Sequence, residues 1–277
     1  MWTPLAASLL LIGAAPSPPP LLSPAALAWV ETQEQADLSQ AFIALEDEYQ
    51  DAYDAWRVAR RAAIEAYNKA RESGADVAFE GPVSIEPDFF PRFDEFAEKG
   101  VFEAQVWCLQ HPQVDAESSG DGPSEAVESD FVKRAMKLLA QGDRGANQLP
   151  RILARHTQRS RVLKPATAKA LLRLVVSAAT EPDAKSTAAY YLASCPADQG
   201  VPEDVAKEQK MAAMRDLVER FPGTSSAERA EGFLFVEENL QIGMVAPEIV
   251  GKDVDGNDMK LTDFRGKVTV IDFWGFW

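Results

Sequence analysis

The feature of this sequence that most constrains its fold is an unbroken apolar repeat between Leu38 and Ala70. Apolar residues recur there at alternating spacings of four and three. The positions are 38, 42, 45, 49, 52, 56, 59, 63, 66 and 70, which read Leu, Phe, Leu, Tyr, Ala, Trp and then alanine throughout. Because residues three and four apart share one face of an α-helix, the pattern predicts one long amphipathic helix. Asp37 is a suitable N-cap and Gly74 a suitable stop.

The apolar face of this helix tapers from large side chains to alanine. Its C-terminal half therefore needs a neighbour that approaches closely. Two partners satisfy this requirement: an antiparallel helix of the same chain, and a second copy of the chain in a coiled coil. The sequence leaves both open.

Beyond a Gly- and Pro-containing break at 74–88, apolar periodicity predicts further helices that follow in pairs. The expected pairs are 91–98 with 101–110, 131–141 with 149–159, 166–180 with 183–194, and 205–221 with 225–238. The later pairs begin near 131, 166 and 205, close to the period of tetratricopeptide-like helical repeats. An irregular α-bundle fits equally well, because the units share no evident sequence identity. The acidic, Gly/Ser-rich stretch 114–130 is predicted to be a mobile loop.

The 277-residue chain has a net charge of −15, which does not suit a general nucleic-acid partner. The charge is unevenly distributed. Residues 31–56 carry eight acids and no base, whereas residues 133–173 carry eleven Lys or Arg against the single acid Asp143. This basic block suits an acidic partner or a membrane face, or it pairs with the acidic N-terminal helix of the same chain.

Residues 1–28 are predicted to be a signal peptide. Their apolar stretch, 5–15, is too short to span a bilayer, and Ala26-Leu27-Ala28 provides a small-x-small cleavage site. No basic residue precedes Arg57, so a Pro-rich leader is the alternative. We expect an exported protein of the periplasm or cell envelope, without an integral membrane span.

The cysteines and histidines suggest no separate chemistry. Cys108 and Cys195 lie in apolar helical contexts without C-x-x-C spacing, where a free cysteine usually behaves as a small buried hydrophobe; a disulfide between them is the alternative. His111 and His156 are isolated, so no metal site is expected. The sequence has neither a phosphate-binding Gly loop nor a G-x-S-x-G nucleophile elbow, and no cofactor is expected.

At Gly243 the pattern changes from helix to strand. A short strand is predicted around Ile249, followed by a turn at 255–257 and a return strand over 259–261. A one-turn helix at 262–264, stopped by Gly266, leads into an apolar strand that begins at Val268. A run of β-branched and aromatic residues such as VTVIDFW is typical of a strand buried inside a sheet.

Residues 243–277 also carry a family resemblance. The motifs G-x-x-A-P, D-x-x-G, L-x-D-F-R-G-K and V-x-V-I-D-F-W follow one another in this segment. Together they resemble the opening of the redoxin branch of the thioredoxin superfamily, which includes thiol-disulfide oxidoreductases and peroxide reductases. The helical periodicity of the preceding residues predicts a mainly α chain, and the resemblance adds the start of an α/β domain. A helical region, 38–240, would precede the β-hairpin and first core strand of a truncated thioredoxin-like α/β domain.

In that family the strand leads into W-C-x-x-C, whose first cysteine is held as a nucleophilic thiolate at a helix N-terminus. In this sequence FWGFW stands where the family has the residues just before the cysteine, and the sequence stops before the nucleophile. The resemblance places Asp272 where a buried carboxylate takes up and returns a proton. Trp274 and Trp277 would shape substrate access. Ordinary strand and core residues are the alternative interpretation of these three.

Three explanations account for the missing nucleophile: a truncated gene, a degenerate redoxin kept as a scaffold, or a selenoprotein whose UGA codon was read as stop. We favour the third as a hypothesis, because selenocysteine would replace cysteine at this position. The complete protein would serve cell redox homeostasis as an antioxidant, acting on protein thiols and disulfides or on peroxide. The 277 residues alone would be inactive. The alternative is a non-enzymatic helical-repeat scaffold that binds a protein partner.

Overall fold

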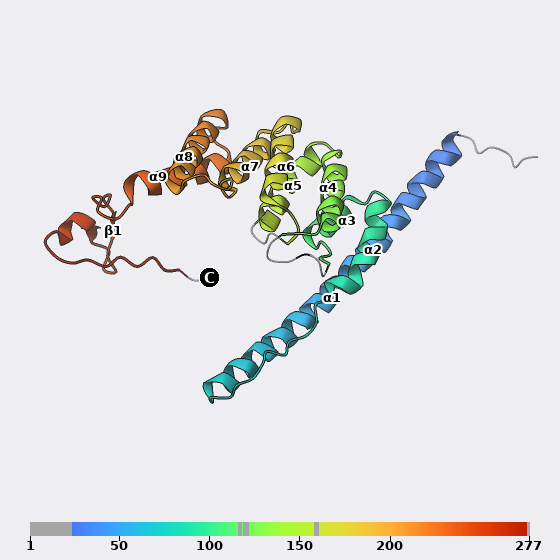
Figure 1. The fold of residues 1–277 in the computed structure, drawn as a ribbon, viewed down its shortest axis with the longest axis horizontal. Coiled ribbons are helices and arrows are strands. Elements are labelled where there is room, and N and C mark those ends of the chain that lie inside the picture. Colours follow the sequence, from blue (N-terminus) through green and yellow to red (C-terminus); the bar gives the residue numbers. More distant parts are fainter. Residues whose placement is uncertain (1–23, 116–117, 119–121, 158–160, 276–277) are drawn as a thin grey trace, which may run out of the picture. The chain divides into compact units, whose positions relative to one another are not determined.

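The computed structural model describes residues 24–115, 118, 122–157 and 161–275, and the side chains from residue 34 onward within these ranges. The elements are α1 (Pro24–Glu72), α2 (Glu86–Glu98), α3 (Phe102–Gln110), α4 (Glu125–Leu139), α5 (Asp143–Thr157), α6 (Pro165–Ala178), α7 (Pro182–Ser194), α8 (Glu203–Arg220), α9 (Ser225–Asn239), β1 (Val250–Lys252), β2 (Asp258–Lys260) and the 3₁₀ helix η1 (Leu261–Phe264). The mainly α architecture expected from the sequence is confirmed (Figure 1). The chain divides into two compact units, of which the first ends at Ile85 and the second begins at Glu86.

Helix α1 is the long helix that the apolar repeat predicts, but it begins earlier than expected. It starts at Pro24, so Asp37 lies inside it and the predicted N-cap is wrong. Pro24 suits a first helical position, and no helix breaker follows before Asp37. The predicted end is confirmed. The Ala75 N–H donates to the Ala70 carbonyl at 3.1 Å, and Gly74 has a φ of 84°, which favours glycine. Of the predicted signal peptide, residues 1–23 lie outside the described residues.

The apolar face of α1 is covered unevenly. Phe42 and Leu45 are buried, whereas Ala59 and Ala66 are exposed. Within the first unit, the segment that follows α1 has no regular secondary structure, yet Phe79 packs edge-on against Tyr67 with ring centroids 5.6 Å apart. The described neighbour of the C-terminal half of α1 is therefore an irregular segment rather than an antiparallel helix.

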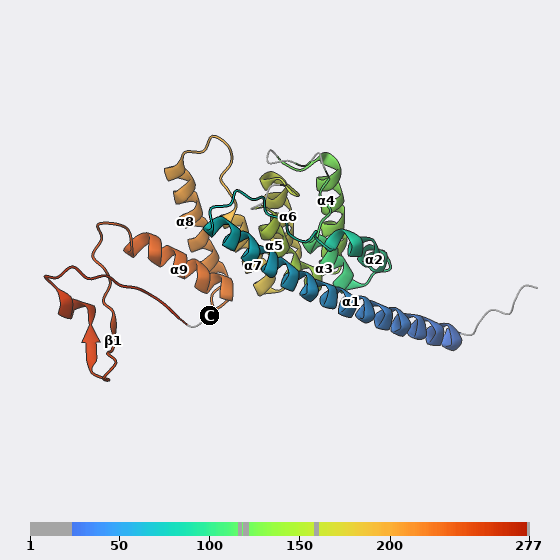
Figure 2. The same ribbon diagram turned by 90° about the horizontal axis from the view of Figure 1, so that it is seen from below.

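Helices α2 to α9 form four successive helical hairpins (Figure 2). The two helices of each hairpin pack together, and the second helices stack in the order α3, α5, α7 and α9. Interactions between hairpins recur at similar separations along the chain. Examples are Arg134 with Asp94, Arg144 with Glu103, Thr167 with Glu128, Thr180 with Asp143, and Thr187 with Ser226. Contacts limited to neighbouring hairpins are typical of a helical solenoid, which favours the repeat over the irregular bundle.

Three helices of this array begin at least five residues earlier than the sequence predicts. Helix α2 starts at Glu86 and not at 91, so Pro91 lies inside it. Helix α4 starts at Glu125 inside the expected loop, because the Ser124 side chain accepts the Val127 N–H at 3.2 Å and caps the helix. Helix α5 starts at Asp143, so Pro150 lies in its interior although proline usually marks a helix start. Pro150 and its neighbour Leu149 are fully buried, and this packing offsets the missing backbone hydrogen bond.

Several cations of the basic block 133–173 pair with carboxylates of the second unit. Arg134 contacts Asp94 and Asp130, and Lys137 contacts Glu98. Lys164 binds Glu128 in the next hairpin, and Lys169 binds Asp198 beyond α7. Apart from Arg134–Asp130, which lies within α4, these ion pairs link one hairpin to the hairpin or loop next to it.

Glu128 of α4 ties two hairpins together at the start of α6. It accepts the Thr167 hydroxyl at 2.7 Å and the Lys164 N–H at 3.0 Å, and its second oxygen lies 3.0 Å from the Lys164 ammonium. Burial acts to raise the pKa of Glu128, but these hydrogen bonds and the Lys164 charge together lower it below its ordinary value.

The Glu128→Gln substitution is expected to lower the free energy of unfolding by about 1 kcal/mol at pH 7, because it weakens charge-assisted hydrogen bonds. A carboxyl whose pKa is lowered by folding stabilises the fold above its unfolded pKa of about 4.3, and this contribution disappears as pH falls through the folded pKa. Urea titrations at several pH values should therefore show the difference between wild type and variant at pH 7 and little difference well below pH 4.3. An equal difference at all pH values would contradict this role.

Candidate functional site

The first part of the segment that resembles redoxins, through Gly266, folds locally as the sequence predicts. Strands β1 and β2 pair antiparallel with Val250 opposite Lys260 and Lys252 opposite Asp258. Helix η1 follows directly, and Gly266, with a φ of 83°, ends it. The hairpin and the one-turn helix are therefore confirmed.

Asp253 organises the tight turn between the two strands. Its carboxylate accepts the N–H groups of Asp255 at 2.9 Å and Asn257 at 2.8 Å, and the Asn257 side-chain amide also donates to it. The Asn257 side-chain and backbone hydrogen bonds lower the pKa of Asp253. Gly256 has a φ of 85°, which the turn requires. This carboxylate has a structural role, and the described residues contain no group of His, Cys, Asp or Glu side chains arranged to hold a metal ion.

Glu248 fastens the start of the hairpin to η1. Its carboxylate accepts the Thr262 hydroxyl at 2.6 Å and the Thr262 N–H at 3.1 Å, while the Leu261 N–H donates to the Ile249 carbonyl at 2.9 Å. The Thr262 hydroxyl is the largest influence that lowers the pKa of Glu248. Sequence reasoning missed Glu248, because nothing in the spacing of Glu248 and Thr262 along the chain indicates that they meet.

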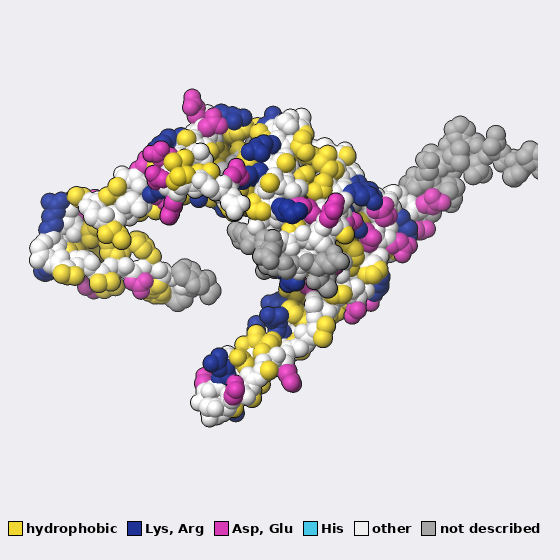
Figure 3. Space-filling model, viewed as in Figure 1, with side chains coloured by type: hydrophobic (Ala, Val, Ile, Leu, Met, Phe, Trp, Pro, Cys, Tyr) yellow, Lys and Arg dark blue, Asp and Glu magenta, His cyan; other side chains and the backbone are white. Residues whose placement is uncertain are grey.

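The segment after η1 differs from the prediction. Residues 268–275 form no strand, because no strand among the described residues pairs with them. Their apolar side chains are exposed, with 99% of Val268 and 89% of Val270 accessible, and hydrophobic atoms are visible over the C-terminal segment in Figure 3. Asp272 is exposed, so the expected buried carboxylate is not found, and Trp274 is exposed as well. Trp277 lies outside the described residues.

The two cysteines are poor nucleophiles. Both are free thiols, and Cys108 is buried in α3. Burial raises the pKa of Cys108 to about 12, and burial also raises the pKa of Cys195. Since the thiolate is the reactive form, neither cysteine is prepared for thiol-disulfide exchange near pH 7. The interpretation of both residues as small hydrophobes is confirmed.

Thiol labelling checks this conclusion. At pH 8 we expect Cys108 to react with 5,5′-dithiobis(2-nitrobenzoate) at least about a hundredfold more slowly in the native protein than in urea, because it is both buried and protonated. Cys195 is half-buried and should react faster than Cys108. A Cys195→Ser variant isolates the Cys108 signal. Rapid labelling of native Cys108 would contradict the burial of its thiol.

The histidines have structural surroundings. The His156 Nε2 atom lies 2.9 Å from the Leu109 carbonyl oxygen in the core, and the His111 Nδ1 atom lies 2.9 Å from the Trp107 carbonyl oxygen. Burial lowers the pKa of His111. Each imidazole is thus engaged with the backbone of α3, and the two rings share no catalytic arrangement.

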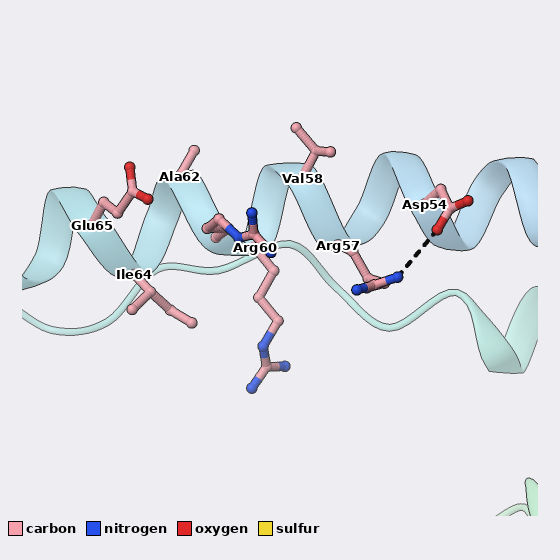
Figure 4. A pocket seen from close by; sticks show the side chains of 8 residues that line it. Asp54, Arg57, Val58, Arg60, Ala62, Ile64 and Glu65 are labelled. Carbon is pink, nitrogen blue, oxygen red and sulfur yellow. Dashed lines mark hydrogen bonds and ion pairs between the residues drawn. The ribbon is translucent and has the colours of Figure 1, made fainter. Parts of the chain in front are cut away.

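A shallow hollow lies on the surface of α1 (Figure 4). It is lined by Asp54, Arg57, Val58, Arg60, Arg61, Ala62, Ile64 and Glu65, all from one helix. Arg57 and Asp54 form an ion pair at 3.4 Å within it. An open surface of a single helix neither excludes water nor converges polar groups on a point, so it lacks the properties of an active site.

Comparison with known proteins supports the resemblance over a short stretch. The chain is 40% identical over 47 residues to thiol-disulfide oxidoreductase ResA of Bacillus thuringiensis subsp. konkukian and of Bacillus anthracis. It is 42% identical over 38 residues to ResA of Geobacillus thermodenitrificans. Part of this chain is similar to thiol-disulfide oxidoreductases. The Bacillus match covers 17% of this chain and 27% of the relative, so the chain spans about a quarter of the length of these curated relatives.

The similarity suggests a thioredoxin-like region and does not extend to the rest of the chain. No family model matches the chain. No solved structure matches it either. None of the described helices combines the length and the apolar character needed to cross a membrane.

Proposed function

We propose that residues 243–277 are the opening of a redoxin domain and that the complete protein exchanges disulfides or reduces peroxides. The observation that carries this proposal is the similarity to ResA together with the local fold of the segment. The β-hairpin and η1 precede an apolar run whose side chains lie in solvent. A run such as VTVIDF has the composition of a strand buried on both faces, so it suits the inner strand of a larger sheet.

The reactive group in this proposal follows Trp277. Burial raises the pKa of the Cys108 and Cys195 thiols, so neither cysteine of the described residues is an activated thiol. Selenocysteine would suit the position after Trp277, because a selenol is more acidic than a thiol and stays ionised near neutral pH. Asp272 would relay a proton once the sheet covers it, and Trp274 and Trp277 would border the substrate. Protein disulfides and peroxides are the proposed substrates, and no dissociable cofactor is required.

The proposal includes export to the periplasm or cell envelope, directed by residues 1–28. Oxidising compartments maintain disulfides, so a thiol-disulfide oxidoreductase has substrates there. The supporting feature is the apolar stretch 5–15 followed by Ala26-Leu27-Ala28. N-terminal sequencing of the secreted protein tests this part, since a mature chain that begins at Trp29 is the predicted product.

The redox proposal is tested by turnover. The 277-residue chain and a form extended through the proposed active site should be compared for insulin disulfide reduction and for peroxide reduction. We expect activity only in the extended form, and we expect its loss when the residue after Trp277 is serine. Robust turnover by the 277-residue chain would contradict the proposal.

A helical scaffold is the second candidate function, and the four stacked hairpins favour it. Stacked helical hairpins present extended surfaces that bind other proteins. If residues 1–240 retain a protein partner as tightly as the extended protein does, binding belongs to the helices. Loss of the partner on removal of residues 243–277 would instead assign binding to the redoxin segment.

A further inference from the structure

The apolar repeat of α1 forms a seam along one side of the helix from Leu38 to Ala70. Its spacing of four and three residues continues without a break, which is the heptad pattern of a coiled coil. The helix runs uninterrupted from Pro24 to Glu72, so the whole seam lies on one rod (Figure 1). At 1.5 Å per residue the seam is about 48 Å long. A surface of this length and pattern suits a long helix as its partner.

The C-terminal half of the seam is made of alanines that lack such a partner. Ala59 and Ala66 are exposed. Phe79 packs on Tyr67, which stands beside the seam and not in it. Helix α1 is the only helix in the described part of the first unit, so no other helix of that unit covers the alanines.

We propose that the seam of α1 pairs with the seam of α1 in a second copy of this chain, antiparallel about residue 54. Each seam position then meets the position of the other copy that lies equally far from residue 54. The layers are Leu38 with Ala70, Phe42 with Ala66, Leu45 with Ala63, Tyr49 with Ala59, and Trp56 with Ala52. Every layer thus holds one large side chain and one alanine, so the two helices keep an even separation. Because the helix meets its own copy, the contact is two-fold symmetric.

The side-chain volumes favour this orientation over a parallel one. A parallel pair in register would place Phe42 on Phe42 at one end and Ala66 on Ala66 at the other, so the separation of the helices would have to change along the seam. The large half and the alanine half of one straight helix cannot meet within one chain. Phe42 and Leu45 are already buried in the single chain, and in the dimer the alanines of the second copy replace their present cover.

The charges beside the seam favour the same orientation. Glu46 and Arg60 occupy the same flanking position of the heptad, and in the antiparallel dimer Glu46 of each copy lies beside Arg60 of the other. Two ion pairs of opposite charge therefore form. The other flanking pairs are Ser39 with Tyr67, Tyr53 with Tyr53, Ala41 with Lys69, Glu48 with Ala62, and Ala55 with Ala55. None of these pairs brings like charges together.

Sedimentation velocity over a concentration series measures the association. The average mass should rise toward twice that of the chain as concentration increases, and a mass that stays monomeric at every concentration overturns the proposal. Ala59→Lys/Ala66→Lys should weaken dimerisation at least about tenfold, because it places charges in the apolar seam. Both alanines are exposed in the single chain, so its fold should tolerate the lysines.

Ala44→Lys/Val58→Lys is the matched control for the seam variant. Ala44 and Val58 are also exposed, but they lie on the side of α1 away from the seam. The control adds the same charge to the same helix and should leave dimerisation unchanged. Equal effects of the two double variants would overturn the assignment of the contact to the seam.

Spin labels report the orientation of the two helices. Gln40→Cys, Asp54→Cys and Asn68→Cys, one in each protein and all in a Cys195→Ser background, place labels at exposed positions while Cys108 stays buried. In the antiparallel dimer the two labels at 40, or at 68, lie about 42 Å apart along the axis, whereas the two labels at 54 lie side by side. Double electron–electron resonance should therefore give one short and two long distances. Three short distances, or no distance between copies, overturn the proposal.

Exchanging the flanking charges distinguishes a second copy from the same chain. Glu46→Arg and Arg60→Glu should each weaken dimerisation several-fold, because two ion pairs become like-charge contacts. The double variant Glu46→Arg/Arg60→Glu should restore dimerisation, since the pairs form again with their signs reversed. Within one helix the two positions are about 21 Å apart, so they cannot compensate for each other there. If the double variant dimerises no better than the single variants, the proposal is overturned.

Discussion

Replacing Gly145 by alanine is expected to lower the free energy of unfolding of the helical region by about 3 kcal/mol or more. Gly145 lies in the first turn of α5, where α4 and α5 approach closely. A Cβ at this position would stand 1.8 Å from the Leu138 carbonyl oxygen and 2.7 Å from its carbon. Both atoms belong to the backbone of α4, so relief requires the two helices to separate. Urea unfolding followed by circular dichroism measures the loss.

Gly232→Ala in α9 is the matched control for this substitution. Gly232 also lies within a helix, and a Cβ there would meet no atom within 4 Å. Alanine should therefore stabilise the protein slightly, by about 0.5–1 kcal/mol, because it restricts the unfolded chain and favours helix. If Gly145→Ala proved as harmless as Gly232→Ala, the close packing of α4 on α5 would be wrong.

Phe93→Ala is expected to cost about 3–5 kcal/mol of unfolding free energy. Phe93 of α2 is fully buried and stacks on Trp107 of α3 with ring centroids 3.9 Å apart and planes 9° from parallel. Its removal leaves a cavity in the first hairpin that the surrounding helices cannot fill without moving. Thermal unfolding should show a large decrease in Tm, with a loss of the near-ultraviolet dichroism that a buried tryptophan produces.

Phe235→Ala in α9 is the matched control. It tests whether the cost of Phe93→Ala comes from burial and not from the loss of a phenylalanine ring as such. Phe235 is 49% exposed, so the same substitution removes much less buried surface and should cost below about 1.5 kcal/mol. Equal effects at the two positions would show that Phe93 is not part of the core.

The helical part of the fold was largely predictable, because it depends on local periodicity. The apolar repeat gave the course of α1, Gly74 gave its end, and the four hairpins have the order expected. The starts of α4 and α5 were missed for a physical reason. In α4 the Ser124 cap outweighed the loop-like composition of residues 114–130. In α5 the burial of Pro150 outweighed the usual position of proline at a helix start.

The predictions for the candidate site succeeded where the structure is local and failed where it depends on distant partners. The turn around Asp253 and the stop at Gly266 are encoded within a few residues, and both were predicted. The strand predicted from Val268 does not form, because a strand exists only when a neighbouring strand pairs with it. For the same reason, Asp272 has no buried environment here.

The most direct test of the redox proposal is the coding sequence that follows the codon for Trp277. The similarity to ResA predicts that the reading frame continues with a cysteine or selenocysteine codon and then completes a thioredoxin-like domain. A frame in which neither such a residue nor such a domain follows would contradict the proposal.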